Sequence, residues 1–95
     1  MSRGISRLGD LCTGHGGYPP RQSIEASTDV FANKLGIVRV GDKFAIHCDH
    51  HECHDGTQSD GSSSVYVNGK KVARIDDDID CGSKNLEGSG DVFCG

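Results

Sequence analysis

An internal repeat is the feature that most constrains how this chain of 95 residues can fold. The segment STDVFANKLGIVRVGD (residues 27–42) aligns without a gap with SSSVYVNGKKVARIDD (residues 62–77). Serine, valine, an aromatic residue, asparagine, arginine and aspartate recur in the same order in both segments. Self-similarity of this kind indicates that one structural unit is built more than once.

Each copy is predicted to form a β-hairpin. In the second copy, residues 65–67 run outward and residues 72–75 return. Asn68-Gly69 supplies the turn, because both residues accept positive φ. In the first copy, residues 30–32 and 37–40 flank a turn over residues 33–36.

The two ends of the chain contain the halves of a third copy. SGDVFCG (residues 89–95) matches the outgoing strand, and GISRLGD (residues 4–10) matches the return strand. Joined through space, they form a third hairpin and bring the termini together. A lone hairpin is marginal in water, whereas three that close on one another bury their edges. We therefore predict an all-β fold with a single domain over residues 1–95: a small pseudo-threefold cone of three β-hairpins.

Composition and charge limit the classes of function. The net charge of −4 and the pI of about 5.6 argue against a nucleic-acid binder, which would present a basic face. No apolar run is long enough for a membrane span, and the start lacks a secretory signal, so we expect folding in a reducing cytoplasm. Only 34% of the residues are hydrophobic, so a metal ion, a disulfide or a partner chain should add stability.

Histidine and cysteine are concentrated between the hairpins. In HCDHHECHDG (residues 47–56), six of the ten residues are His or Cys. In a reducing compartment, clustered cysteines are read as metal ligands rather than as disulfides, and the odd total of five cysteines agrees with that reading.

We expect each connection between hairpins to supply a ligand. HGG (residues 15–17), HDG (residues 54–56) and CGS (residues 81–83) each place a candidate ligand before two small or turn residues. In a pseudo-threefold fold these positions converge on the axis, and a structural site needs a fourth ligand. The predicted metal site consists of His15, His47, His54 and Cys81.

Some assignments stay open. His47 is the predicted ligand from the cluster because it comes first after the strand, and the alternatives are His50, His51, Cys48 and Cys53. The C-x4-C spacing of Cys48 and Cys53 also leaves open a second zinc site. Cys12 and Cys94 are expected to be small apolar residues. A set of three His and one Cys suits zinc or ferrous iron, and we favour one structural zinc ion over iron.

The repeated hairpins and the turn-borne ligands resemble the PAAR-repeat family. The matching segments are RLGD, RVGD, VYVNGK and CGS. The Pro-Ala-Ala-Arg motif of that family is degenerate here, as KVAR (residues 71–74) and GIVR (residues 36–39). The resemblance covers essentially the whole chain. It implies a cone that caps the trimeric β-helical spike of a contractile injection machine, with a metal near its vertex held by three His and one Cys.

The resemblance implies a mechanical function and no enzymatic activity. The short chain without an extension and the segment TGHGGYPPR (residues 13–21) look most like the central spike tip of a contractile phage tail baseplate, which sharpens the spike for membrane penetration. Such a cap would be part of the virion and assembled in the host cytoplasm. The alternative is the PAAR tip of a bacterial type VI secretion spike.

The resemblance also implies partners. One cap would bind one trimeric spike through a base that carries the strand ends near Val30, Val65 and Val92. Its tip would contact the host outer membrane, and no nucleic acid would bind.

Two other classes compete with this interpretation. A small zinc-dependent enzyme would need an open coordination position and a general base, for which Glu52 is the one carboxylate in the His cluster that looks suitable. A disulfide-stapled secreted domain is the other alternative.

Overall fold

The computed structural model describes residues 2–95, in which short β-strands and bridges are joined by turns and loops and no helix occurs. The all-β prediction is therefore confirmed. No segment of the described chain forms a helix able to cross a membrane. The strands are β1 (Arg3–Gly4), β2 (Phe31–Ala32), β3 (Leu35–Gly36), β4 (Lys43–Cys48), β5 (Cys53–Thr57), β6 (Tyr66–Val67), β7 (Lys70–Lys71) and β8 (Phe93–Cys94).

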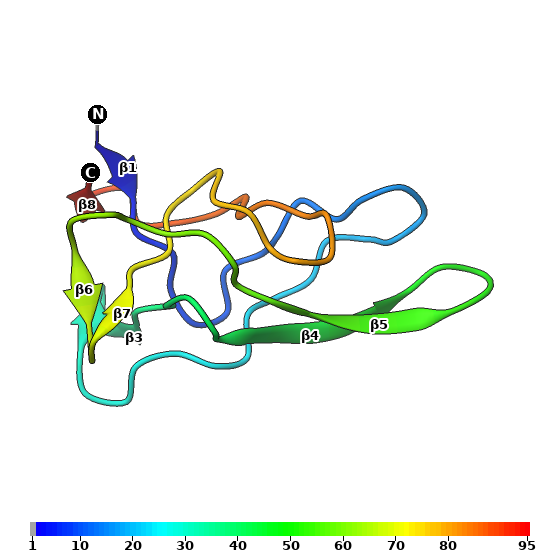
Figure 1. The fold of residues 1–95 in the computed structure, drawn as a ribbon, viewed down its shortest axis with the longest axis horizontal. Coiled ribbons are helices and arrows are strands. Elements are labelled where there is room, and N and C mark those ends of the chain that lie inside the picture. The colour runs from blue at the N-terminus through cyan, green and yellow to red at the C-terminus, as the bar shows by residue number, and fades with distance from the viewer. Residues whose placement is uncertain (1) are drawn as a thin grey trace.

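Three of the four strand pairs are copies of one hairpin. β2 pairs with β3, β6 pairs with β7, and β1 pairs with β8, all antiparallel. In each pair, the aromatic residue faces the equivalent position of the partner strand: Phe31 faces Gly36, Tyr66 faces Lys71, and Phe93 faces Gly4. The pair made by the two chain ends confirms the predicted third hairpin, and the termini lie side by side (Figure 1).

The hairpin turns are tighter than the sequence prediction for the first copy. Asn33 and Lys34 both have positive φ, as do Asn68 and Gly69, so both turns have two residues. The turn in the first copy was predicted over residues 33–36, and this was wrong because Leu35 and Gly36 already pair in β3. The predicted return strands therefore begin too late in both copies.

The residues after each hairpin join the three copies into a closed ring. Single antiparallel bridges connect Arg7 to Ile37, Arg39 to Val72, and Ile5 to Arg74. At the centre, three backbone N–H groups donate in a circle, from Ser6 to Ala73, from Ala73 to Val38, and from Val38 to Ser6, with N···O distances of 2.9–3.0 Å. All three residues are buried. This triangle of hydrogen bonds marks the pseudo-threefold axis, and the ring leaves no free strand edge at the centre.

The repeated polar residues hold each copy in the same way. An arginine side chain binds the aspartate three residues later in every copy, with Nε···Oδ2 distances of 2.9–3.0 Å. A buried serine hydroxyl accepts the N–H of the third residue after it, which opens each outgoing strand. These contacts surround a core of Ile5, Ala32, Ile37, Val67, Val72 and Cys94. The motif that identified the repeat is therefore also the motif that builds it.

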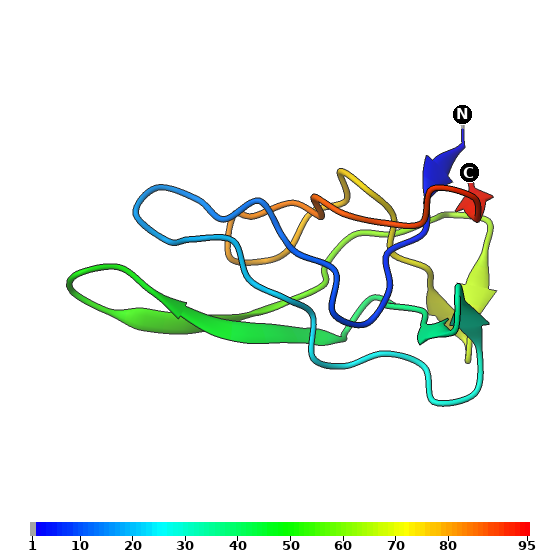
Figure 2. The ribbon, with the colours of Figure 1, turned by 180° about the vertical axis from the view of Figure 1, so that it is seen from behind.

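Three connections extend from this base in one direction. We call them the first arm (residues 11–22), the second arm (residues 43–57) and the third arm (residues 78–84). Figures 1 and 2 show all three leaving the hairpins toward the end of the molecule that is far from the termini. The second arm, the β4–β5 hairpin, reaches furthest and contributes to the longest dimension of 38 Å. The sequence interpretation treated this segment as a ligand-bearing loop and missed its strands.

The arms are bound to one another in a second ring. Bridges link Ser23 to Phe44, Gln58 to Ile79, and Cys12 to Asn85. Inside this ring lies a small cluster of buried side chains, with one from each arm: Cys12, Phe44 and Ile79. Because each of these lies two residues after the aspartate of its copy, they are threefold-equivalent positions. The axis therefore continues from the base into the arms.

Candidate metal centre

Four side chains from the three arms converge beyond the Cys12, Phe44 and Ile79 cluster. They are His15, His47, His54 and Cys81, and one ligand atom from each lies within 4.8 Å of all the others. These are the four residues predicted from the sequence. Neutral imidazole and thiolate sulfur are the donors that zinc takes in closed structural sites.

The second arm places two of the four by strand pairing. His47 on β4 and His54 on β5 are cross-strand partners, and their Nε2 atoms lie 2.7 Å apart. His15 comes from the tight turn of the first arm, where it pairs with Tyr18. Its Nε2 lies 3.1 Å from the Nε2 of His54. In a tetrahedral site with zinc–nitrogen bonds of about 2.0–2.1 Å, nitrogen ligands lie about 3.3 Å apart. The 3.1 Å separation is close to this value, and the 2.7 Å separation is shorter.

The protonation state of His47 is set by its second nitrogen. Nδ1 lies 2.9 Å from the carbonyl oxygen of Pro19, which can only accept, so Nδ1 carries the proton and the lone pair of Nε2 faces the cluster. Burial lowers the pKa of His47, and it also lowers the pKa of His15. Both effects favour the neutral imidazole, which is the form that binds a metal.

The repeat explains why four ligands come from three arms. His15 and His47 each lie five residues after the aspartate of their copy, and Gly82 holds this place in the third arm. On the return side, His54 and Cys81 each lie eight residues before the serine of the next copy, and Pro19 holds that place in the first arm. The sequence interpretation treated His15, His54 and Cys81 as equivalent, and this was wrong because His15 belongs to the outgoing set.

The two equivalent positions without a ligand support the others. Pro19 supplies the carbonyl that orients His47. Gly82 has positive φ, and a Cβ built there would lie 3.7 Å from Cγ of His15. That distance is an ordinary contact, so it is the left-handed backbone that favours glycine here, in the turn beside the His15 ring.

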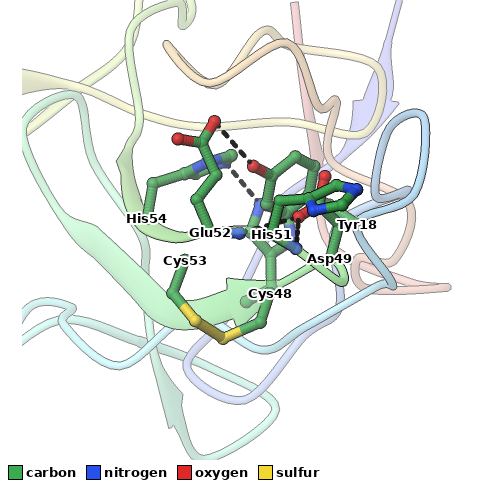
Figure 3. Close-up of a disulfide and its surroundings, with 8 residues drawn as sticks. Tyr18, Cys48, Asp49, His51, Glu52, Cys53 and His54 are labelled. Carbon is green, nitrogen blue, oxygen red and sulfur yellow. Dashed lines mark hydrogen bonds between the residues drawn. A yellow bond between two sulfur atoms is a disulfide. The ribbon is translucent and has the colours of Figure 1, made fainter.

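Tyr18 covers the histidines and was not singled out in the sequence. Its ring centroid lies 4.7, 4.8 and 4.2 Å from the ring centroids of His15, His47 and His54. Its hydroxyl donates to Oε1 of Glu52 at 3.2 Å (Figure 3). Glu52, the general base that the enzyme alternative would need, is exposed at the tip and engaged in this contact.

Cys48 and Cys53 form a disulfide, which corrects the expectation that the clustered cysteines are ligands and not disulfides (Figure 3). They are cross-strand partners at the ends of β4 and β5, so pairing brings the two sulfurs together. The disulfide leaves no thiols for a second zinc site at these positions. It flanks the ligands, since Cys48 follows His47 and Cys53 precedes His54.

The other residues left open also have defined places. His50 and His51 are exposed in the turn between β4 and β5. In that turn, the Asp49 carboxylate accepts the backbone N–H groups of His51 and Glu52, and these bonds lower the pKa of Asp49. Cys12 and Cys94 are free and buried, as small apolar residues are.

The base carries an exposed apolar surface at the opposite end of the molecule. Val65 and Val92 are half-buried and pack against the base core, and Val30 is more exposed. The next residue in each copy is an aromatic that is more exposed still, and the sequence interpretation did not single it out. Phe31, Tyr66 and Phe93 are 57%, 54% and 53% exposed.

Comparison with known proteins identifies the family. The family model described as "PAAR motif" matches residues 12–85, most of the length of the chain. A search of curated proteins finds no match. The chain belongs to the PAAR-motif family, as the resemblance of its repeats predicted.

Proposed function

We propose that this protein is the metal-bound tip that caps the trimeric β-helical spike of a contractile injection machine, with one chain per spike trimer. The observation that carries this proposal is the closed ring of backbone hydrogen bonds from Ser6, Val38 and Ala73. It gives a single polypeptide the threefold symmetry that the blunt end of a trimer has.

The base would be the surface that binds the spike. It presents an aromatic side chain at the same position of each copy, on Phe31, Tyr66 and Phe93, beside the three valines Val30, Val65 and Val92. Large exposed aromatic side chains are enriched at the centres of protein interfaces. A trimer offers three identical sites, and three equivalent hairpins can occupy all of them at once.

The arms would form the penetrating end. They are too slender for a large apolar core, since their buried cluster consists of Cys12, Phe44 and Ile79. A metal ion held by His15, His47, His54 and Cys81 would tie the three arms together beyond that cluster. The metal would act there as a structural cross-link, because the free energy of binding then adds to the free energy of folding.

Within this function, we favour the central spike of a contractile phage tail baseplate, where the cap would be part of the virion and its tip would meet the host outer membrane. This choice comes from the resemblance of the segment with residues 13–21. A tip secreted by a bacterial type VI system is the alternative, and the two differ in the spike that the base must fit.

Mixing with spike fragments tests the proposal. The purified chain is combined with the C-terminal β-helix of a phage baseplate spike and, separately, with that of a type VI spike, and the mass of each complex is measured by light scattering. We expect one chain per trimer with one of the two fragments. Binding to neither fragment, or binding of three chains per trimer, would contradict the proposal that one chain caps one spike trimer.

A matched pair of variants locates the binding surface. Phe31→Asp should abolish the complex, because it places a charge in the centre of the proposed interface. Ile46→Asp is the control, since Ile46 is 67% exposed and lies on the second arm. Equal loss of binding in both variants would mean that the base is not the docking surface.

A further inference from the structure

Arg21 is a buried cation beside the candidate metal centre. The residue is only 6% exposed, and its guanidinium lies over the ring of Phe44, with Cζ 5.6 Å from the ring centroid. Nη1 donates to Sγ of Cys12 at 3.1 Å, and Nη2 donates to Sγ of Cys81 at 3.6 Å. Of these two sulfurs, Cys81 belongs to the four-residue cluster.

The charge of Arg21 is not balanced by a carboxylate. The ion pairs within residues 2–95 join other arginines or Lys84 to aspartates, and none includes Arg21. Its Nε is buried without a hydrogen-bond partner. Because an uncompensated buried cation is costly, its retention at this place calls for an anionic acceptor. The sulfur of a metal-bound cysteine is such an acceptor, since cysteine binds a metal as the thiolate.

The threefold-equivalent positions are shaped around this side chain. Arg21, Gly56 and Ser83 are equivalent, since each lies six residues before the serine of the next copy. A Cβ built on Gly56 would lie 2.3 Å from Nη2 of Arg21 and 3.1 Å from Sγ of Cys81. One long side chain can cross the axis because the other two positions are small.

We propose that Arg21 is a positioning residue of the metal centre, which donates an N–H···S hydrogen bond to the Cys81 ligand and is itself anchored by Cys12. The inference rests on the proposed metal centre and adds a residue to it. A charge-assisted hydrogen bond holds the sulfur in place and withdraws electron density from it. Contacts with Phe44 and Cys12 hold the guanidinium in place.

Cobalt(II) is a suitable probe, because a cobalt–thiolate bond gives a charge-transfer band in the near ultraviolet. We expect the band of the cobalt-loaded protein to move to longer wavelength in Arg21→Met, since removal of the hydrogen bond raises the energy of the sulfur lone pairs. Outer-sphere partners of metal ligands commonly change metal affinity by about 10- to 100-fold, so we expect a loss of cobalt affinity in that range.

Arg7→Met is the control for a purely structural effect. Arg7 pairs with Asp10 in the base and has no contact with the candidate ligands, so its loss should lower stability and leave the band unchanged. If Arg21→Met does not fold, Arg21→Lys and Cys12→Ala make the same test. In both, the band should shift in the same direction, because the sulfur loses its fixed donor.

The outcomes separate this inference from the metal centre itself. A parent protein that binds cobalt, with a band unmoved in all three variants, would overturn the role of Arg21 and leave the centre intact. A parent protein that binds no cobalt through Cys81 would overturn both. A shift in Arg21→Met and also in Arg7→Met would assign the effect to general loosening and would overturn the specific role.

Discussion

The base and the arms of this protein are built from the same repeat, but only the base keeps the same residues in all three copies. In the base, the same residues recur three times, and the contacts recur with them, as in the pairs Arg7–Asp10, Arg39–Asp42 and Arg74–Asp77. In the arms, equivalent positions hold different residues, as His15, His47 and Gly82 show. The base is symmetric where a trimer would bind, and the arms are asymmetric where a single ion would take four ligands from three arms.

The base and the arms are also stabilised by different contacts. The base has a closed ring of backbone hydrogen bonds and an apolar core of six buried side chains. The arms have a small core and a cluster of three histidines and one cysteine that an ion would join. The arms should therefore depend on a metal ion for their stability, and the base should not.

Removal of the metal should have the largest effect, and the effect should be confined to the arms. A structural zinc ion contributes on the order of 10 kcal/mol to folding, so chelation or the double variant His54→Ala with Cys81→Ala should lower the Tm sharply. Hydrogen exchange should show lost protection at His47 and Gly56, with protection retained at Ser6, Val38 and Ala73.

His50→Ala is the matched control, since His50 lies in the same arm and is exposed. It should melt like the parent. If the double variant also melts like the parent, the four residues do not form a structural site.

Loss of the Asp77 side chain should lower the free energy of unfolding of the base. Asp77 is fully buried and accepts from Arg74 and from Arg3. Removing one partner of a buried ion pair leaves the other charge unpaired, so Asp77→Ala should cost about 3–5 kcal/mol in urea unfolding. Asp78→Ala is the control, because Asp78 is exposed and should change stability little. Equal losses of stability in Asp77→Ala and Asp78→Ala would show that the buried ion pair does not stabilise the base.

Removal of the Cys48–Cys53 disulfide should have a smaller and local effect. The bond closes a short loop, so its loss in Cys48→Ser with Cys53→Ser should cost about 2 kcal/mol by the loop-entropy model. Zinc titration of this variant should still give one ion per chain, because neither cysteine belongs to the candidate ligand set. A loss of zinc stoichiometry would place the disulfide cysteines in the site.

Exchange of the hairpin turns should have the smallest effect. Lys34 has positive φ at the position where the second copy has Gly69. A side chain in the left-handed region is strained, so Lys34→Gly should raise the free energy of unfolding by about 0.5–1 kcal/mol, and Gly69→Lys should lower it by a similar amount. Thermal unfolding of the two variants measures this directly, and changes of the same sign would show that the turns are not equivalent.

The base could be predicted from the sequence because its contacts repeat. The serine, valine and Arg-x-x-Asp positions each recur three times, and the third copy was found at the two chain ends although β1 and β8 are far apart in sequence. The return strands were placed too late, since pairing begins directly after the two-residue turns, at Leu35 and Lys70. Alternation of residues in a short segment does not reveal which strand is the partner.

The arms could be predicted only in part, because their residues do not repeat. Three of the clustered ligands followed from the alignment of the three connections, and His47 followed from the His-rich stretch. The equivalence of His15 with His47 requires counting from Asp10 and Asp42 and was missed. The Cys48–Cys53 disulfide depends on cross-strand register, which followed only once β4 and β5 were known. Arg21 gave no signal, since nothing in an isolated arginine shows that it is buried against two sulfurs.

X-ray absorption at the metal edge of the purified protein tests the central claim most directly, namely that three unequal arms hold one ion on the axis of a symmetric base. We predict one metal per chain, with a first shell of three imidazole nitrogens and one sulfur, and loss of the sulfur in Cys81→Ala. A protein without bound metal, or a shell with two or more sulfurs, would contradict the account.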